Sequence, residues 1–398
     1  MTSVDEALGL IAATVSPLAS EEVETSSAVQ RVLSAAVHTV HPLPMFDQSA
    51  VDGYAVRHRD LTGRRTVLRV GSTVAATAQS KAPRLAEGEA ARIFTGAMVP
   101  VGADTIVRQE MTLRDGESVV IEGHVVPGTD LRRQGEELPR GAEVAAANTL
   151  VTPGLIGALA VAGARRVAVR RQPRVHVLVT GDEVVPGGGV LGLGQIPDSN
   201  GPLIRAHLQR WGVTPVVVGH VADDAAAVRD ALDHALSDAD LVITSGGVSV
   251  GDLDFIPTMA EAVGARRVLW KVAQRPGGPL YVAERDGSLL LGLPGNPAAV
   301  LVNLCVHVRH ALDLALGLDP ARRWHRGRLS EDLHGMADRT FWLRATARTD
   351  DDGVVRLDPL GGQGSHMLSN LARADALVRV PPTSERCGDC FWWTPIND

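Results

Sequence analysis

The chain has 398 residues, more than one ordinary hydrophobic core serves, so we expect roughly two to four domains. Its 45% hydrophobic and 21% charged residues are typical of a globular protein. A formal net charge of −7, without a long run of Lys or Arg, argues against a nucleic acid or a membrane surface as a partner. The acidic N-terminus and the lack of an unbroken apolar stretch of about 18 residues predict neither a secretion signal nor a membrane span. Three cysteines are too few for a disulfide framework, which favours the reducing cytoplasm.

The N-terminal part of the chain has a helical pattern. Ser3 and Glu6 have the spacing of a capping box, and apolar residues then recur at helical intervals. We predict a second helix over residues 26–37. From there to about residue 128, short β-branched runs alternate with Gly, Pro and Asp turns, which predicts a domain of short strands. Pro153 then begins a further helix, for which Gly163 is the expected C-cap.

The pattern changes between residues 174 and 318. Near-continuous apolar runs alternate with amphipathic helices, which is typical of a parallel sheet covered on both faces. The last eighty or so residues return to short strands (341–345, 354–357 and 376–380), which predicts a small β domain. The strands expected in the middle region are 175–179, 215–218, 241–243 and 289–291, and the expected helices are 202–211, 224–236 and 297–316.

A glycine-rich loop, residues 244–254, follows the apolar strand 241–243 and precedes a predicted helix. Its glycines leave a bare backbone whose N–H groups can surround an anion, and its serines add hydroxyls. Asp252 and Asp254 end the loop with carboxylates that could hold a hard cation over that anion. The loop therefore predicts a site for phosphate and a divalent metal. The alternative is a strand-to-helix turn in which the glycines only supply positive φ.

Four further polar loops, each containing glycine, follow or adjoin strands of the same region. Because ligands bind beyond the carboxyl ends of parallel strands, we expect these loops and the glycine-rich loop to form one pocket. Asn200 is the expected N-cap of the helix that follows it. The four loops are residues 180–183, 198–201, 219–224 and 293–297.

Two other groupings favour a structural role. Cys387 and Cys390 have a C-x-x-C spacing, but a lone pair supplies only two of the four ligands that zinc requires. His307 and His310 share a helix face and lack a third ligand, so we expect them to pack in the interior. Cys305 lies in an apolar helix and is expected in the core.

Several motifs, taken in their order along the chain, resemble the molybdopterin molybdenumtransferase family, which includes the bacterial MoeA proteins, the gephyrin E domain and the plant molybdenum-insertase domain. The resemblance covers nearly the whole chain. It rests on Pro42-Leu43-Pro44, the run from Asp47 to Ala55, Phe94-Thr95-Gly96-Ala97, the run from Arg133 to Glu137, the glycine-rich loop and Pro294-Gly295-Asn296-Pro297.

This resemblance implies a multidomain fold of α/β plus β type. A molybdopterin-binding α/β domain with a mostly parallel sheet is expected over residues 173–318. An inserted β domain is expected over 42–128 and a C-terminal β domain over 319–398. The remaining residues, 1–41 and 129–172, would form an elongated split domain of helical and linker character.

The resemblance also implies an activity: molybdate insertion into adenylylated molybdopterin, with Mg²⁺-dependent release of AMP. The substrates would be molybdate and adenylylated molybdopterin, and Mg²⁺ the cofactor. Family members form homodimers with a shared active site, and transient contacts with the adenylyltransferase and with acceptor molybdoenzymes are implied. Two alternatives stay open, namely a molybdopterin adenylyltransferase and a non-catalytic molybdopterin-binding or scaffold protein.

Site residues are carried over position by position. The catalytic residues would be Asp52, Thr95, Asp223, Asp254 and Lys271, with Asp223, Asp254 and Glu137 near the metal. The substrate-binding residues would be Glu183, Ser199, Asn200, Ser245, Gly246, Gly247, Ser249, Arg275, Pro294, Gly295 and Asn296.

Simpler roles compete with some of these assignments, and some residues depart from the family pattern. Asp223 could serve simply as a helix N-cap, and Asp52 could simply form a turn with the glycine that follows it. Arg275 stands where family members often have Lys, Gly278 stands where some members have Lys, and Ala299 stands where Ser is frequent. Glu137 replaces an acidic residue that is often Asp. These departures bear on molybdate affinity more than on the fold.

Overall fold

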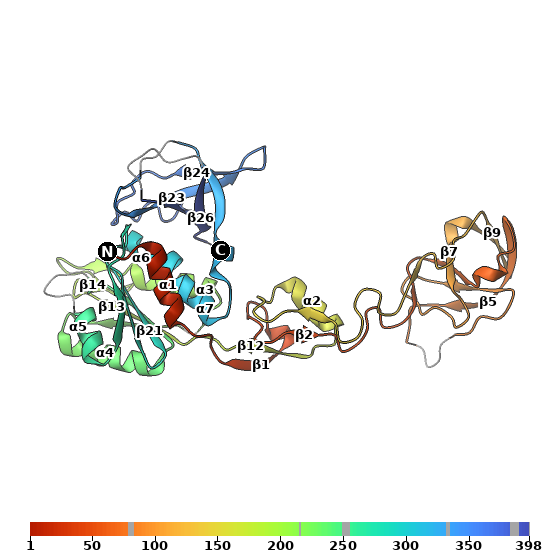
Figure 1. Cartoon of the computed structure of the whole chain (residues 1–398), viewed down its shortest axis with the longest axis horizontal. Coiled ribbons are helices and arrows are strands. Elements are labelled where there is room, and N and C mark those ends of the chain that lie inside the picture. The colour runs from red at the N-terminus through yellow and green to blue at the C-terminus, as the bar shows by residue number, and fades with distance from the viewer. Residues whose placement is uncertain (79–82, 215, 249–254, 332–334, 383–389, 398) are drawn as a thin grey trace.

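The computed structural model describes residues 1–78, 83–214, 216–248, 255–331, 335–382 and 390–397. Figure 1 shows an elongated molecule with a large body at one end, a smaller β body at the other and a narrow segment between them. The large body contains an α/β unit and a β unit formed by the C-terminal residues. The domain boundaries given above stay a prediction.

The distal β body is a single sheet with the strand order β7-β4-β6-β5-β9-β8. Alternating burial along β5 shows the period of a half-buried strand, with Thr66 and Leu68 facing inward. Its interior contains Tyr54, Ile93 and Ile106, all at most 5% exposed. The strands are β4 Gly53–Val56, β5 Arg65–Val74, β6 Glu89–Ile93, β7 Thr105–Arg108, β8 Thr112–Asp115 and β9 Ser118–Glu122.

The narrow segment consists of two-stranded sheets and one helix, α2 Pro153–Val161. Thr152 caps this helix, because its Oγ1 accepts a hydrogen bond from the N–H of Leu155 at 3.2 Å. Gly163 follows the helix with φ +83°, as predicted for its C-cap. The paired strands are β1 Ser20–Glu24 with β12 Arg166–Arg170, β2 Val37–His38 with β11 Glu143–Ala145, and β3 Gln48–Ser49 with β10 Leu131–Arg132.

The predicted helix over residues 26–37 is wrong. Only a short 3₁₀ turn, Thr25–Ser27, forms there, and Gln30 has φ +61°. The backbone beyond it pairs with distant residues, since Leu33 N–H donates to Thr149 O at 2.9 Å and Ser34 N–H donates to Ala168 O at 3.0 Å. Long-range pairing therefore replaces local helix formation, and the segment expected to be helical consists of turns and bends with isolated bridges at Val32 and Leu33.

The α/β unit has a six-stranded sheet in the order β16-β13-β17-β21-β20-β18. The first four strands are parallel, as predicted, while β20 and β18 add an antiparallel edge that the sequence analysis did not identify. The strands are β13 Val175–Thr180, β16 Val216–Val221, β17 Leu241–Ser245, β18 Arg266–Trp270, β20 Tyr281–Arg285 and β21 Ser288–Leu293.

Alternate side chains of each strand face two separate hydrophobic layers. On one face, Val177 and Ile243 pack with α1, α3 and the helix that begins at Pro297. On the other face, Leu178 and Val242 pack with α4 and α5. The helices that cover the two faces are α1 Val4–Thr14, α3 Asn200–Arg210, α4 Ala225–Asp238, α5 Ile256–Ala262, α6 Pro297–Asn303 and α7 Arg309–Ala315.

Helix α1 packs on this sheet and not in the narrow segment. Ser3 and Glu6 form the predicted capping box, with Glu6 N–H to Ser3 Oγ at 3.2 Å and Ser3 N–H to Glu6 Oε2 at 2.8 Å. A π-helical turn, Leu304–Val308, joins α6 to α7 into one helix. By length and composition this is the one helix of the described residues that could cross a membrane, and 78% of its apolar window is buried inside the protein.

The C-terminal unit is a closed sheet in the order β19-β23-β24-β22-β26-β25, with β25 pairing back to β23. Strand β19, Gln274–Arg275, comes from the α/β unit and pairs with β23. The side chain of Gln274 also accepts a hydrogen bond from Trp342 Nε1 at 2.9 Å. These contacts fix the C-terminal unit on the α/β unit. Its other strands are β22 His325–Leu329, β23 Thr340–Thr349, β24 Val355–Pro359, β25 Ala376–Val380 and β26 Cys390–Pro395.

Candidate functional site

The strand order places a crevice between β13 and β17. The chain passes from β13 to β16 on one side and then returns to β17 on the other side, so the connections diverge at this point. Ligands of open α/β sheets bind beyond the carboxyl ends of the strands at such a switch point. A pocket of about 680 Å³ lies there, and we call it the sheet-edge pocket. Of the predicted site residues it is lined by Glu183, Ser199, Asn200, Asp223, Ser245, Gly246, Gly247, Gly295 and Asn296.

Two glycines form the floor of the sheet-edge pocket because no larger residue fits there. Gly246 has φ +97°, and a Cβ added to it would lie 2.7 Å from Thr180 Oγ1 and 3.0 Å from Thr180 O. Gly247 has φ +67°, and its added Cβ would lie 3.0 Å from Ile256 Cγ1. The start of the glycine-rich loop therefore packs directly against the end of β13. Ser249, Asp252 and Asp254, in the remainder of the loop, lie outside the described residues.

Asn200 has a different role from the predicted N-cap. Asp198 caps α3 instead, since its Oδ1 accepts the N–H groups of Asn200 and Gly201, both at 2.9 Å. The Asn200 side chain donates to Ser245 Oγ at 2.8 Å and to Gly295 O at 2.7 Å. It therefore joins three loops of the pocket. Its Oδ1 is buried and has no hydrogen-bond partner among the described residues, which leaves one acceptor at the pocket wall.

Asp223 is not a helix cap either. The cap of α4 is Asp224, whose Oδ1 accepts the N–H of Ala227 at 2.9 Å. Asp223 instead pairs with Asp182 across two loops: the Asp182 N–H donates to Asp223 Oδ2 at 3.3 Å, and the Asp223 N–H donates to Asp182 Oδ1 at 3.1 Å. Glu183 is exposed at the same rim. The arrangement brings carboxylates to the pocket mouth, as the sequence predicted.

Asp198 and His220 form a pair that the sequence analysis did not single out. His220 Nε2 lies 2.9 Å from Asp198 Oδ2, and only 3% of the Asp198 side chain is exposed. Asp198 therefore holds the N-terminus of α3 and the end of β16 at the same time. The run of polar residues from Asp198 to Gly201 was the available signal, but a contact between loops about twenty residues apart is not a local pattern.

The C-terminal unit closes one side of the pocket with the segment 361–370. His366 and Leu368 line the pocket, and Ser365 O accepts the N–H of Ala298 at 3.1 Å. Arg344, 1% exposed, supports this segment by donating to Gly362 O at 3.0 Å and to Gly364 O at 3.1 Å. No local pattern distinguishes His366 in the sequence, because it reaches the pocket only through the docking of two units.

The predicted cations Lys271 and Arg275 do not line the sheet-edge pocket. Lys271 has φ +70°, and its Nζ lies 5.2 Å from the centre of the Trp270 ring. Trp270 Nε1 donates to Val248 O at 3.2 Å, so Lys271 adjoins the base of the glycine-rich loop. Arg275 is exposed on β19, at the seam with the C-terminal unit.

The predicted residue Pro294 and two positions that depart from the family pattern, Ala299 and Gly278, also lie off the pocket lining. Pro294 precedes Gly295 but is not a lining residue. Ala299 is 2% exposed inside α6, so its departure from the family pattern does not remove a group from the pocket wall. A Cβ added to Gly278 would lie 3.1 Å from Gln274 O, so a longer residue at this position would require the backbone to shift.

Asp52, Thr95 and Glu137 lie away from the pocket within one chain. The β4, β6 and β7 strands that flank Asp52 and Thr95 belong to the distal body in Figure 1. Asp52 Oδ1 accepts the Thr95 N–H at 2.8 Å and the Thr95 Oγ1–H at 2.7 Å. These hydrogen bonds hold the pKa of Asp52 below its usual range. Glu137 is exposed in the narrow segment, and its N–H donates to Leu43 O at 3.0 Å.

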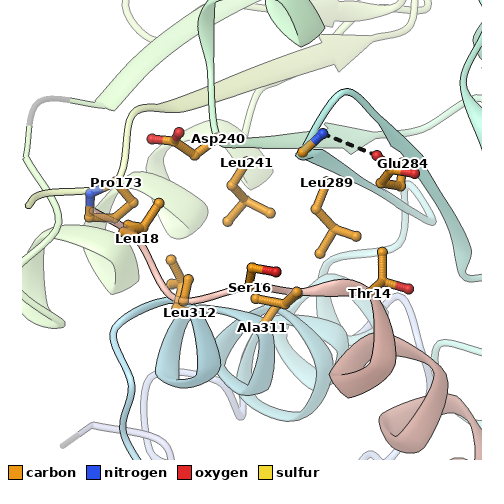
Figure 2. Close-up of a pocket in the computed structure, with 13 residues that line it drawn as sticks. Thr14, Ser16, Leu18, Pro173, Asp240, Leu241, Glu284, Leu289, Ala311 and Leu312 are labelled. Atoms are coloured by element: carbon orange, nitrogen blue, oxygen red, sulfur yellow. Dashed lines mark hydrogen bonds between the residues drawn. The ribbon is translucent and has the colours of Figure 1, made fainter. Parts of the chain in front are cut away.

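A small cavity lies at the opposite edge of the parallel strands (Figure 2). It is lined by Leu241 and Leu289, the first residue of β17 and the second of β21, and by Ser16 of the chain that leaves α1. Its volume of about 40 Å³ is close to the share of one water molecule, about 30 Å³, and is too small for a pterin. The sheet-edge pocket is therefore the candidate substrate site.

The described residues contain no group of three or more His, Cys, Asp or Glu side chains placed to hold a metal ion. Mg²⁺ is commonly bound by one or two carboxylates together with substrate phosphates, so a complete protein cage is not required. Asp223 at the pocket wall fits such a site. Cys305 is buried, Cys390 is exposed on β26, and Cys387 lies outside the described residues.

Three family models match the chain in succession. The first describes the MoeA N-terminal region (domain I and II) and matches residues 2–163. The second describes a probable molybdopterin binding domain and matches residues 176–313. The third describes the MoeA C-terminal region (domain IV) and matches residues 326–395. The second match contains every residue of the sheet-edge pocket except His366 and Leu368.

Similar proteins extend over nearly the full length of the chain. A molybdopterin molybdenumtransferase of Nostoc sp. is 35% identical over 397 residues, which cover 96% of this chain and 90% of that protein. The protein of the same name from Haemophilus influenzae is 32% identical over 91% of this chain and 90% of its own length. The crystal structure of a molybdopterin biosynthesis MoeA protein from Pyrococcus horikoshii has a TM-score of 0.84 and 26% identity, with 100% of both chains covered.

Proposed function

The chain belongs to the molybdopterin molybdenumtransferase family, and from this membership we propose that it transfers molybdenum to molybdopterin in the biosynthesis of the molybdenum cofactor. It is accordingly a transferase. The finer assignment is that molybdate is inserted into adenylylated molybdopterin, with release of AMP. The site of this reaction would be the sheet-edge pocket.

One observation supports this site above the others, namely the position of the sheet-edge pocket at the switch point of the parallel sheet. Its floor is the bare backbone of Gly246 and Gly247, which allows a phosphate to approach closely. Its wall offers the unpaired Oδ1 of Asn200, an acceptor for the N–H groups of a pterin. A volume of about 680 Å³ lies within the range of cofactor sites, about 300–1,000 Å³.

Mg²⁺ would be held at the mouth of the pocket by Asp223, and we propose Asp254 as a second carboxylate ligand. When bound, such an ion neutralises charge on the phosphoanhydride of the adenylate as that bond is cleaved. The protein's own part is to orient the substrate. The Asn200 bridge fixes the loops after β17 and β21, and the loop pairing through Asp182 fixes Asp223.

Asp52, Thr95 and Glu137 would act in this reaction only at the pocket of a second copy of the chain. Asp52 and Thr95 belong to the distal body and Glu137 to the narrow segment, so one chain cannot bring them to its own pocket without a large rearrangement. We assign them to the partner subunit's pocket in a homodimer. Lys271 would meet the oxyanion from the side of the glycine-rich loop, and Arg275 from the seam with the C-terminal unit. We place the enzyme in the cytoplasm, where it would transiently contact the adenylyltransferase and the acceptor molybdoenzymes.

The deciding experiment supplies the purified protein with adenylylated molybdopterin, Mg²⁺ and molybdate, and measures AMP. We expect AMP release that requires both Mg²⁺ and molybdate. Asp223→Asn should abolish it while leaving the circular dichroism spectrum unchanged. Adenylation of free molybdopterin by ATP would instead identify an adenylyltransferase, and binding without any turnover would identify a scaffold; either result contradicts the proposal.

The shared site has its own test. Asp52→Asn and Asp223→Asn should each be inactive alone, because each spoils both sites of a C₂ dimer. After the two variants are mixed and allowed to exchange subunits, half of the dimers are mixed, and each mixed dimer has one intact site. Activity should therefore recover to roughly a quarter of the wild-type value. No recovery under conditions in which labelled subunits demonstrably exchange would place both residues in one chain's site.

A further inference from the structure

A separate cavity lies where the α/β unit meets the C-terminal unit, and we call it the junction cavity. Its volume is about 290 Å³, and it shares no lining residue with the sheet-edge pocket. The end of α3, α7 and β26 come together there (Figure 1). Because one water molecule takes up about 30 Å³ in the liquid, the cavity has room for a polyatomic ion together with several waters.

Three guanidinium groups surround the junction cavity: those of Arg309, Arg322 and Arg323. Arg309 Nε donates to Asp313 Oδ1 at 2.9 Å, and Arg323 Nε donates to Asp313 Oδ2 at 2.5 Å. Asp313 is therefore shared between two arginines, and Arg322 makes no ion pair in the described part of the chain. Three guanidiniums and one carboxylate leave two net positive charges beside the cavity.

Two further features of the cavity lining bear on what it could bind. Burial and the neighbouring Arg323 lower the pKa of Arg309, and Asp313 only partly opposes them. The hydroxyl of Thr394, a lining residue that is 0% exposed, has no hydrogen-bond partner among the described residues. The next carboxylate along the chain, Asp319, does not line the cavity and instead accepts the N–H of Ala321 at 2.9 Å.

We propose that the junction cavity binds a small phosphate-like oxyanion, either free phosphate or the phosphate group of a monoester. Guanidinium groups donate hydrogen bonds in a planar fork that matches such oxygens, and arginine is favoured for this reason where phosphate is recognised. The anion would neutralise the excess charge of α7 and of the 3₁₀ turn Pro320–Arg323 that follows it. Since β26 forms another wall, the bound anion stabilises the seam between the α/β unit and the C-terminal unit.

The test is calorimetric titration of inorganic phosphate into the full-length protein at constant ionic strength. Arg322→Gln removes one guanidinium without disturbing Asp313, and Arg328→Gln, an exposed arginine of β22 that does not line the cavity, is the matched control. We expect Arg322→Gln to raise the Kd of one class of site about tenfold, the effect of one lost charge-assisted hydrogen bond. Arg328→Gln should leave it unchanged.

A second titration with AMP, on the wild type and on Arg322→Gln, distinguishes the sources. AMP that binds more tightly than phosphate and is weakened by Arg322→Gln identifies a monoester as the ligand of the junction cavity, since AMP bound in the sheet-edge pocket would not respond to that change. Molybdate-dependent AMP release is measured in parallel, and we expect Arg322→Gln to keep the wild-type kcat. An equal phosphate Kd in wild type and Arg322→Gln, or an equal loss in both variants, would overturn the inference. Either result would leave the proposed function untouched if AMP release persists.

Discussion

Replacing Gly246 by Ala tests whether the glycine floor shapes the sheet-edge pocket. At φ +97° an added Cβ would be 2.7 Å from Thr180 Oγ1 and 3.0 Å from Thr180 O, and the second contact is with backbone that cannot rotate away. The backbone conformation costs about 1–2 kcal/mol for an L-residue, and overpacking adds about 1–3 kcal/mol. We therefore expect a loss of about 3 kcal/mol from the α/β unit. The end of β13 would shift as well, and with it the pocket wall.

The matched control is Gly295→Ala in the same pocket. Its added Cβ would meet nothing closer than Gly246 Cα at 3.9 Å, which is an ordinary contact, and Gly295 has no positive φ. A compatible Gly→Ala change is worth about 0.4–1 kcal/mol in favour of the folded state. Gly295→Ala should therefore fold at least as stably as the wild type.

Thermal unfolding followed by circular dichroism measures this difference. For a unit of this size, about 3 kcal/mol corresponds to a fall of roughly 10 °C in Tm, which we expect for Gly246→Ala alone. Molybdopterin affinity, measured by quenching of protein fluorescence, should fall in the same variant. Equal Tm values for the two variants would refute the argument, because it depends on the difference between their Cβ environments.

Substitutions at three further positions test separate features. Thr95→Val removes one of the two hydrogen bonds to Asp52, so the pKa of Asp52, measured by NMR titration, should rise toward 3.8; no rise would contradict the cause given for its low value. His207 is neutral when buried, with a pKa of about 4 against 6.5 unfolded, so the stability it contributes is complete above pH 6.5 and is lost as the pH falls toward 4. His207→Leu should therefore weaken the pH dependence of the urea-denaturation midpoint between these pH values. An unchanged slope of the midpoint against pH would exclude His207 as the source of that dependence. Asn200→Asp places a carboxylate where an amide donates to Gly295 O, so substrate affinity should fall at least tenfold while Asn200→Gln falls less; equal affinities would show that the bridge does not shape the pocket.

The sequence predicted the parallel core because that information is local. A strand buried on both faces, such as β17, requires a continuous apolar run, and the capping box of α1 lies within four residues. The predicted family and multidomain fold class are confirmed by the matched models and by the similar structure. The helix over residues 26–37 failed because its backbone pairs with strands more than one hundred residues later, which no local pattern reveals.

In the candidate site, too, some features follow from local sequence and others depend on tertiary contacts. Loops at the ends of β13, β17 and β21 were predicted to converge, because parallel strands present their carboxyl ends at one edge, and the structure brings them together. Asp198, and not the predicted Asn200, accepts the first N–H groups of α3, since both residue types cap helices and only tertiary contacts decide between them. His366 was missed because it depends on how the C-terminal unit docks. Asp254 stays a prediction, since it lies outside the described residues.

Because the molecule is elongated, the proposed reaction depends on dimer formation, and this dependence can be measured. The sheet-edge pocket and the Asp52–Thr95 pair lie in the bodies at the two ends of the elongated molecule. A reaction that needs both therefore needs two chains. Activity per chain should therefore fall on dilution below the dimer dissociation constant, in step with the mass found by analytical ultracentrifugation. If isolated monomers kept full activity, the assignments of Asp52, Thr95 and Glu137 would fail together. The assignment of the pocket itself would stand, because its residues come from one chain.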